Sequence, residues 1–379
     1  MSHAPGDALS RRHQIIREAC ASRSLDALVV TSLPNIRYLT NFTGSAAIVV
    51  LTPDRLQFIT DFRYLTAVTD TVGTGSECPG LELVTVDGSY DATLAAVLQS
   101  MPPTHVGFEA ANLTVARHEW LRATLGAGQS SMALVPTDGV VERARARKDA
   151  YELRTLRTAA EMLSRIVPGA IEDVRRGRTE REVAQSIDER LRREGFEKPA
   201  FDTIVASGPN SALPHAHPSE RRITENDLVV LDFGGVYDSY CVDLTRTVSV
   251  GKADSRVREV YGAVLAAHDL AIEAVRPGAS RFSIDAAARD ELTRRGFGTM
   301  FGHGTGHGLG IEVHEDPRVG MRRADDANDD EAVVVGMVFT IEPGAYLPGW
   351  GGVRIEDDVV VTETAVERLT TAKTELIEK

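Results

Sequence analysis

The sequence predicts an α/β protein of two domains, and three observations support this. The chain has 379 residues, more than one ordinary hydrophobic core accommodates. Short apolar runs alternate with segments of helical spacing over the first 140 residues, as in an α/β domain. Near Thr137–Lys148 the pattern changes to a charged stretch that opens a long amphipathic helix. We therefore place the domains at residues 1–140 and 141–379.

The elements of the first domain follow from the spacing of its apolar residues. Leu9–Ser22 has helical spacing, whereas Ala27–Thr31, Ala47–Leu51 and Leu56–Thr60 are short apolar runs typical of strands. A further helix is expected after Asp61. No cluster of catalytic residue types is evident in this domain.

The second domain contains a weak internal repeat. Ile171–Gly177 (IEDVRRG) recurs as Ile272–Gly278 (IEAVRPG), and each copy closes one helical pattern and precedes another. Thr179 and Glu182 form a capping box after the first copy, and Ser283 is the candidate N-cap after the second. So short a match also arises by chance. A strand pair carrying two acids follows each helical pair, however, and this order favours two related halves around one centre.

Composition restricts the partners and the compartment. The net charge of −13 argues against nucleic acid or an anionic membrane surface as a partner. Cys20, Cys78 and Cys241 form no CxxC motif, which fits a reducing cytoplasm. The N-terminus lacks the apolar region of a signal peptide, and no apolar run is long enough to span a bilayer. We expect a soluble, cytoplasmic protein.

Two acids interrupt an apolar hairpin in the second domain. Residues 228–250 indicate two strands that turn near Tyr237-Asp238, which would put Asp232 and Asp243 directly opposite each other on one face. Two carboxylates so close repel each other unless a cation lies between them. Alternatively, one acid caps a turn and the other faces solvent, but the apolar flank Val229–Leu231 disfavours this interpretation.

Glu342 and Glu356 repeat this arrangement on two further strand candidates. Strand alternation puts Arg354 on the same face as Glu356, where it would orient that carboxylate or hold a substrate carboxylate. The alternative for Arg354 is an ordinary surface cross-strand pair. We expect Asp357 and Asp358 to be strand-end or supporting groups.

A glycine-rich segment, GHGTGHGLGIEVHE, contains three histidines, His303, His307 and His314. Its glycines exclude a stable helix and suit close backbone approach around a buried site. The segment matches neither HExxH, nor a phosphate-binding loop, nor GxGxxG. One such histidine would more often be structural, but together with His215, His217 and four acids these three favour a site.

The ligand types limit the metal chemistry. Four carboxylates formally balance two divalent cations, and one imidazole among them gives an oxygen-rich shell. We expect two metal ions, and we favour manganese over cobalt, ferrous iron or zinc as the metal. The expected nucleophile is a metal-bridging water or hydroxide, because two cations lower its pKa and polarise a carbonyl group.

In chain order, the motifs D-x10-D, HGxGHGLGxxVHE, EPG and GxRxED resemble the pita-bread metallopeptidases. Within them, the chain is similar to the proline-specific branch of aminopeptidase P and Xaa-Pro dipeptidase (prolidase). NIRYLTNFTGS and TDFRYL resemble the non-catalytic, creatinase-like domain of that branch. The resemblance implies a creatinase-like α/β domain followed by a catalytic domain with a curved, mainly antiparallel sheet and pseudo-two-fold halves.

The resemblance also implies a metal-binding role for each of five residues. Asp232 would chelate one metal, His307 and Glu342 would hold the other, and Asp243 and Glu356 would bridge the two.

Other roles implied by the resemblance concern catalysis. His215 would meet the substrate near the scissile bond, His314 would stabilise the oxyanion, and His303 would contact the proline side. Glu342 would also carry a proton to the leaving nitrogen. Arg354 matches a substrate-facing or ligand-orienting arginine, and Tyr346 matches a nearby substrate-binding tyrosine. His217 stays a loop residue, and Ala324–Glu331 is expected to be a surface loop.

The implied activity is hydrolysis of the Xaa-Pro bond of proline-containing peptides. Of the two enzymes of this branch, we favour an aminopeptidase slightly over a dipeptidase. We expect a homodimer, in which the N-terminal domain of a neighbouring subunit can influence substrate length. A metal-free creatinase-type hydrolase and an inactive binding module are the alternatives. The intact carboxylates disfavour both.

Overall fold

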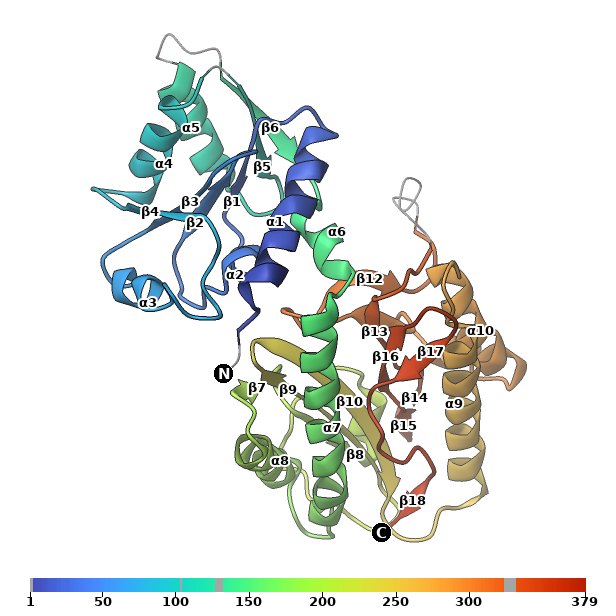
Figure 1. Cartoon of the computed structure of the whole chain (residues 1–379). Coiled ribbons are helices and arrows are strands. Elements are labelled where there is room, and N and C mark those ends of the chain that lie inside the picture. Colours follow the sequence, from blue (N-terminus) through green and yellow to red (C-terminus); the bar gives the residue numbers. More distant parts are fainter. Residues whose placement is uncertain (1–2, 103, 127–131, 324–331) are drawn as a thin grey trace. The chain divides into compact units, whose positions relative to one another are not determined.

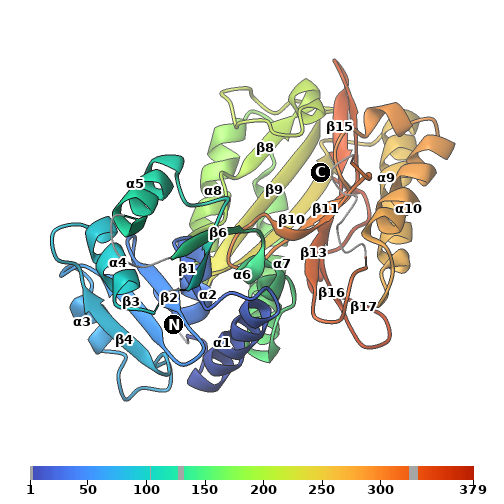
Figure 2. The same ribbon diagram turned by 90° about the horizontal axis from the view of Figure 1, so that it is seen from above.

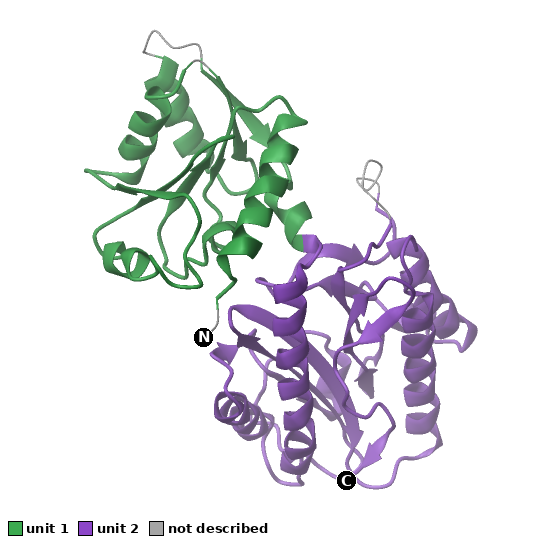
Figure 3. Ribbon diagram, viewed as in Figure 1, with its two compact units in different colours: residues 1–145 green, residues 146–379 purple. Residues whose placement is uncertain are grey.

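The computed structural model describes residues 3–102, 104–126, 132–323 and 332–379, so the expected surface loop Ala324–Glu331 lies outside the described residues. The chain divides into two compact units, Met1–Arg145 and Ala146–Lys379 (Figure 1, Figure 3). The domain boundary expected after residue 140 falls within helix α6 (Val140–Ala146). No helix among the described residues is both long and apolar enough to cross a membrane.

The first unit is built on a six-stranded mixed sheet with the order β4-β3-β2-β1-β5-β6. Its strands are β1 (Ala27–Val30), β2 (Ile48–Leu51), β3 (Leu56–Thr60), β4 (Leu81–Thr85), β5 (His105–Glu109) and β6 (Ala133–Thr137). Its helices are α1 (Gly6–Ala21), α2 (Leu33–Thr40), α3 (Leu65–Thr69), α4 (Tyr90–Gln99) and α5 (Val115–Gly126). Leu94 and Leu98 of α4 and Leu121 of α5 pack on Val29 and Phe108 of the sheet. The helix and strands expected from apolar spacing are confirmed, although the helix after Asp61 is only the short α3.

The charged stretch at the boundary forms two helices rather than one long helix. Helix α6 ends at Ala146, where Arg147 forms a β-bridge with Met337 and the Lys148 amide donates to the Gly336 carbonyl. Helix α7 (Ala150–Asp173) then begins with its own capping box, formed by Asp149 and Glu152. These backbone pairings interrupt the helical ladder that amphipathic spacing alone predicted.

The second unit repeats one order of elements, two helices followed by a sheet. Helices α7 and α8 (Glu180–Glu194) precede the first sheet, and α9 (Ser255–Ala274) and α10 (Arg281–Arg294) precede the second. The capping box of Thr179 and Glu182 is confirmed at the start of α8. The N-cap expected at Ser283 is wrong. Helix α10 already begins at Arg281, and the side chain of Ser280 accepts the Phe282 amide.

The sheets of this unit are mainly antiparallel, as expected, with one parallel pair between β10 and β18. The first sheet contains β7 (Lys198–Pro199), β8 (Ile204–Ser207), β9 (Leu228–Tyr237), β10 (Tyr240–Ser249) and β18 (Ile377–Glu378). The second contains β11 (Gly306–Gly308), β12 (Glu315–Val319), β13 (Val338–Ile341), β16 (Asp357–Val361) and β17 (Val366–Arg368). A two-stranded ribbon, β14 (Gly344–Leu347) and β15 (Gly351–Arg354), accompanies them.

The helices cover the outer faces of these sheets. Helix α7 packs on β9 and β10, and α9 packs on β13, β14 and β15. Figure 2 shows the two helical layers on opposite sides of this unit, with the strands between them. The long strands β9 and β10 and the shorter strands of the second half therefore meet in the middle of the unit, where the predicted ligands lie.

Candidate metal centre

Asp232 and Asp243 come from the two strands of one hairpin, β9 and β10. The turn residues are Asp238 and Ser239, both with positive φ angles (48° and 71°), as a two-residue hairpin turn of primed type requires. Asp232 is therefore opposite Thr245, and the prediction that it faces Asp243 directly is wrong because the turn lies one residue further along. Asp243 is two residues before Thr245 on the same strand, and side chains two residues apart point to the same face of a sheet. Asp232 and Asp243 therefore still share one face, as diagonal neighbours.

Glu342 and Glu356 lie in a second, longer hairpin made of two ladders. In the β13–β16 ladder Ile341 is opposite Asp357, and the β14–β15 ladder continues the same register. Glu342 and Glu356 occupy the break between the ladders, at opposite positions. This pairing is as predicted from strand alternation.

His307 enters the site from the short strand β11. Its Nδ1 lies 3.1 Å from the Gly308 carbonyl oxygen, and its Nε2 lies 3.5 Å from Glu342 Oε1. A neutral ring that donates through Nδ1 keeps Nε2 available as a metal ligand. The flanking glycine is required by packing, because a Cβ atom at Gly306 would lie 1.8 Å from the Thr340 carbonyl oxygen. The glycine-rich segment thus allows close approach, as expected.

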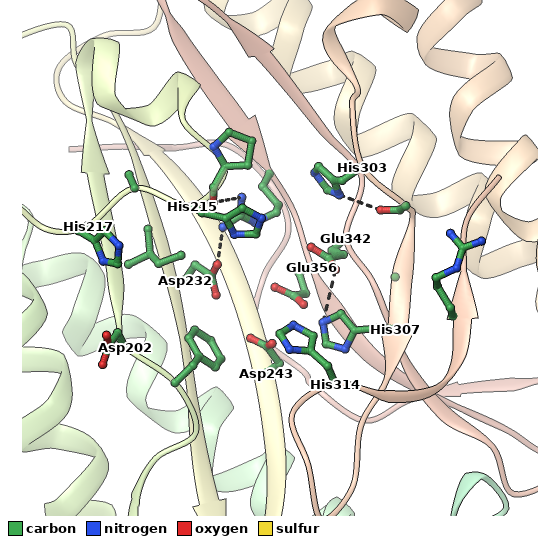
Figure 4. A pocket seen from close by; sticks show the side chains of 18 of the residues that line it. Asp202, His215, His217, Asp232, Asp243, His303, His307, His314, Glu342 and Glu356 are labelled. Atoms are coloured by element: carbon green, nitrogen blue, oxygen red, sulfur yellow. Dashed lines mark hydrogen bonds and ion pairs between the residues drawn. The ribbon is translucent and has the colours of Figure 1, made fainter. Parts of the chain in front are cut away.

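The five residues line one pocket of about 410 Å³ (Figure 4). One ligand atom from each of Asp243, His307 and Glu356 lies within 4.8 Å of the others. Asp243 Oδ1 is buried and has no hydrogen-bond partner among the described residues. A buried carboxylate oxygen without a donor fits a bound cation.

The electrostatics of the cluster also fit divalent cations. Burial, followed by neighbouring carboxylates, raises the pKa values of Asp243 and Glu356 well above their usual range. Burial likewise raises the pKa of Glu342 to about 8, although Arg354 opposes this effect. Burial and the neighbouring His314 lower the pKa of His307 to about 4, so its ring is neutral at pH 7. The acids hinder one another's ionisation, and two divalent charges would remove that conflict.

Arg354 is buried at 3% exposure, which contradicts the alternative of a surface pair. Its guanidinium donates to Asp232 Oδ2, to the Tyr346 hydroxyl at 2.8 Å and to Thr245 Oγ1 at 3.2 Å. Thr245 in turn donates to Glu356 Oε2 at 2.5 Å. Sequence reasoning missed Thr245, and the correct turn position would have identified it as the residue opposite Asp232.

The other predicted residues surround the cluster. His303 Nε2 lies 3.0 Å from the hydroxyl of Tyr346, which is buried behind His303 and Arg354. The rings of His307 and His314 meet edge to face, with centroids 4.3 Å apart. His215 lines the pocket from the loop before β9.

His217 and Asp202 are among the residues that line the pocket without a predicted role. Figure 4 shows both beyond Asp232, on the side away from His303 and His307. Asp202 carried no motif in the sequence, and the pairing of β7 and β8 with β9 on either side of it brings this segment to the site.

Asp357 and Asp358, expected as strand-end or supporting groups, are fully buried. Asp358 Oδ2 accepts the Asp243 amide at 3.1 Å, which fixes the backbone of that predicted ligand. Asp357 accepts from Arg246 at 2.8 Å, and Arg246 also donates to the Glu356 carbonyl at 2.6 Å. Sequence reasoning missed Arg246, which anchors the backbone of Glu356.

Comparisons with known proteins show which family the chain belongs to. Residues 154–363 match the model of metallopeptidase family M24, and residues 12–147 match that of the creatinase/prolidase N-terminal domain. An Xaa-Pro dipeptidase of Pyrococcus furiosus is 43% identical over 240 residues, 63% of this chain and 67% of that protein.

Solved structures extend the similarity to nearly the whole chain. The structure of an Xaa-Pro dipeptidase from Bacillus anthracis has a TM-score of 0.89 and 35% identity, covering 98% of this chain and 100% of that one. The structure of an X-Pro aminopeptidase from Thermotoga maritima has a TM-score of 0.85 and 31% identity, covering 97% and 99%. The chain therefore belongs to metallopeptidase family M24, as an enzyme of its proline-specific, pita-bread branch.

Proposed function

We propose that the protein hydrolyses the peptide bond between an N-terminal residue and a following proline. The observation that carries this proposal is the buried cluster of four carboxylates and His307 in one pocket, surrounded by His215, His303 and His314. The relatives named as Xaa-Pro dipeptidase and X-Pro aminopeptidase support the choice of proline.

The five predicted ligands would hold two divalent cations. Asp232 would bind one, His307 and Glu342 the other, and Asp243 and Glu356 both. The oxygen-rich donor set supports manganese, with cobalt, ferrous iron and zinc as alternatives. Bound cations of this kind supply Lewis acidity, which polarises the scissile carbonyl and lowers the pKa of water.

The protein's own groups orient the substrate and move the proton. Arg354 donates to the Tyr346 oxygen, so the Tyr346 hydroxyl proton is directed to His303 Nε2. This arrangement holds His303 neutral, with its other nitrogen directed to the Gly304 carbonyl at 2.8 Å. We propose that the His303 ring packs against the proline ring and that His314 donates to the developing oxyanion. His215 would contact the substrate near the scissile bond, and Glu342 would return the proton to the leaving nitrogen.

Proline suits such a site for a chemical reason. The bond before proline is a tertiary amide without an N–H group, so an enzyme cannot hold the substrate through that donor. A site that grips the carbonyl oxygen and the free amino terminus does not need it.

Substrate length has two candidates. The first is an aminopeptidase that accepts longer peptides, and the motifs are compatible with it as they are with a dipeptidase. The second is a dipeptidase. Arg318 and Arg323 line the same pocket and suit the free C-terminal carboxylate of the proline in an Xaa-Pro dipeptide.

The test is to incubate the manganese-loaded protein with Ala-Pro, Ala-Pro-Ala-Ala and Ala-Ala. We expect release of alanine from at least one proline peptide and none from Ala-Ala. Cleavage of Ala-Pro alone assigns the dipeptidase, and cleavage of the tetrapeptide assigns the aminopeptidase. Failure on both proline peptides, with two metals bound, overturns the proposal.

We further propose that residues 1–140 form a non-catalytic domain and that the protein acts as a cytoplasmic homodimer. The match of residues 12–147 to the creatinase/prolidase N-terminal domain supports the first point, and three buried free cysteines suit a reducing compartment. The charge of −13 supports peptides rather than nucleic acid or membranes as partners. Light scattering of the purified protein tests the dimer.

A further inference from the structure

The pocket that contains the candidate metal centre is lined by opposite charges on its two sides. Asp202 is the one lining acid, among the described residues, outside the cluster of four. It lies two residues before Ile204, which is opposite Asp232 in the β8–β9 pairing. Arg318 is opposite His307 in the β11–β12 pairing, and Arg323 follows on the same side of the fold. The acid thus belongs to the first half of the unit and the arginines to the second, with the metal ligands between.

This polarity orients a peptide substrate, and the argument rests on the proposed function. An Xaa-Pro peptide has its carboxylate on the proline side, so Arg318 and Arg323 favour that end. The N-terminal residue then points toward Asp202 and His217, which Figure 4 shows on the side away from His303.

The wall next to Asp202 suits a long side chain with a charged end. Phe201, Ile204 and Ala216 line the pocket there and provide apolar surface. Asp202 is exposed, and no hydrogen bond or ion pair within the described part of the chain occupies its carboxylate. Lysine and arginine bury their methylene stems on apolar surface while the cationic head meets a carboxylate. A neutral His217 ring would offer the same head a second acceptor.

We propose that Asp202 is a specificity-determining residue that favours substrates with lysine or arginine as the N-terminal residue. The expected preference is modest, because an ion pair with an exposed carboxylate is partly screened by solvent. We expect about a three- to tenfold higher kcat/KM than for an uncharged side chain of the same length.

The experiment compares Lys-Pro, norleucine-Pro and Glu-Pro as substrates of the manganese-loaded protein, or the same series extended by Ala-Ala if only longer peptides are cleaved. Norleucine keeps an apolar stem like that of lysine and lacks the charge. In Asp202→Asn the ratio of kcat/KM for Lys-Pro to norleucine-Pro should fall to about one. Asp202→Lys should reverse the order and favour Glu-Pro over Lys-Pro.

Asp290→Asn is the matched control, because Asp290 is an exposed acid on α10 that does not line the pocket. It removes the same charge and should keep the wild-type ratio. An equal ratio in wild type and Asp202→Asn, with norleucine-Pro cleaved normally, overturns this inference and leaves the proposed function intact. If wild type cleaves no Xaa-Pro peptide of either length, the proposed function fails and the inference fails with it.

Discussion

Glu342 and Glu356 lie opposite each other at a break in one long hairpin. The register is the same on both sides of the break, from Ile341 opposite Asp357 to Gly344 opposite Arg354. The two glutamates therefore enter the pocket from facing strands, while the diagonal pair Asp232 and Asp243 enters from the other sheet. Two hairpins, one from each half of the unit, thus bring four carboxylates into one buried volume.

Removing one of the two carboxylates that we propose to bridge the metals should remove metal as well as activity. Asp243→Asn and Glu356→Gln take a charged oxygen from the centre of the cluster, and we expect kcat/KM to fall by more than about 100-fold. Metal content by mass spectrometry should fall below that of wild type. Asp290→Asn is the control for loss of an acid elsewhere in the unit. Normal turnover and metal content in both variants would mean that these residues do not bridge.

The metal-depleted protein should lose stability as the pH rises. The pKa of Glu342 is raised from 4.5 to about 8 in the folded chain, so between these values the native state binds more protons than the unfolded state. The stability that the protonated Glu342 gives to the folded state is fully present below pH 4.5 and is lost as the pH passes about 8. The lowered pKa of His307 adds stability as the pH rises to 6.5, so melting temperatures should fall between about pH 6.5 and 8, and Glu342→Gln or added manganese should flatten this decline. A melting temperature that rises across the same window in metal-depleted wild type contradicts this prediction.

The buried pair of Arg246 and Asp357 should matter for stability. The side chains are 2% and 0% exposed, so Arg246→Met takes the nearest cationic partner from a buried carboxylate. His268 at 3.1 Å and Arg368 at 3.6 Å remain beside it, but the guanidinium donors to the carbonyls of Glu356 and Ala372 are lost as well. We expect a loss of about 3–5 kcal/mol in the free energy of unfolding, measured with urea. Arg157→Met is the matched control, because Arg157 and Glu367 are 41% and 39% exposed. Arg157→Met should lower the free energy of unfolding by no more than about 1 kcal/mol. Equal losses for the two variants would refute the claim that burial makes the Arg246 ion pair important for stability.

The Tyr346 hydroxyl should contribute to turnover without holding metal. It joins Arg354 to His303, so Tyr346→Phe frees the His303 ring to rotate. We expect kcat/KM for an Xaa-Pro peptide to fall about tenfold, with metal content unchanged. Tyr261→Phe removes a hydroxyl that donates to the Thr374 carbonyl away from the pocket, and it should keep wild-type activity. Equal activity in the two variants would exclude this role.

Strand alternation and motif spacing predicted which side chains lie in one pocket, because both are local properties. Alternation alone placed Arg354 on the face of Glu356, and spacing alone put two acids on one hairpin. The register of that hairpin depended on where the chain turns, and the positive φ angles of Asp238 and Ser239 were not readable from residue types. A shift of the turn by one residue was enough to replace Asp243 by Thr245 opposite Asp232.

Long-range contacts were beyond sequence reasoning. Arg246 anchors Glu356 from 110 residues away, and Asp202 reaches the pocket because β7 and β8 both pair with β9. Neither residue lies in a motif, and their roles follow from the tertiary pairing of strands. The N-cap Ser280 was missed for a smaller reason, since Ser280 and Ser283 are both plausible caps by type.

The most direct test of the account is a metal titration of the depleted protein during hydrolysis of the proline peptide that the loaded protein cleaves, Ala-Pro or Ala-Pro-Ala-Ala. Manganese is added stepwise, bound metal per chain is measured by mass spectrometry, and the release of alanine is followed in the same samples. We predict no release in chelator and full activity only when two ions are bound per chain. Cleavage in chelator at the loaded rate would contradict the metal centre, and two bound ions without cleavage of any Xaa-Pro peptide would contradict the function.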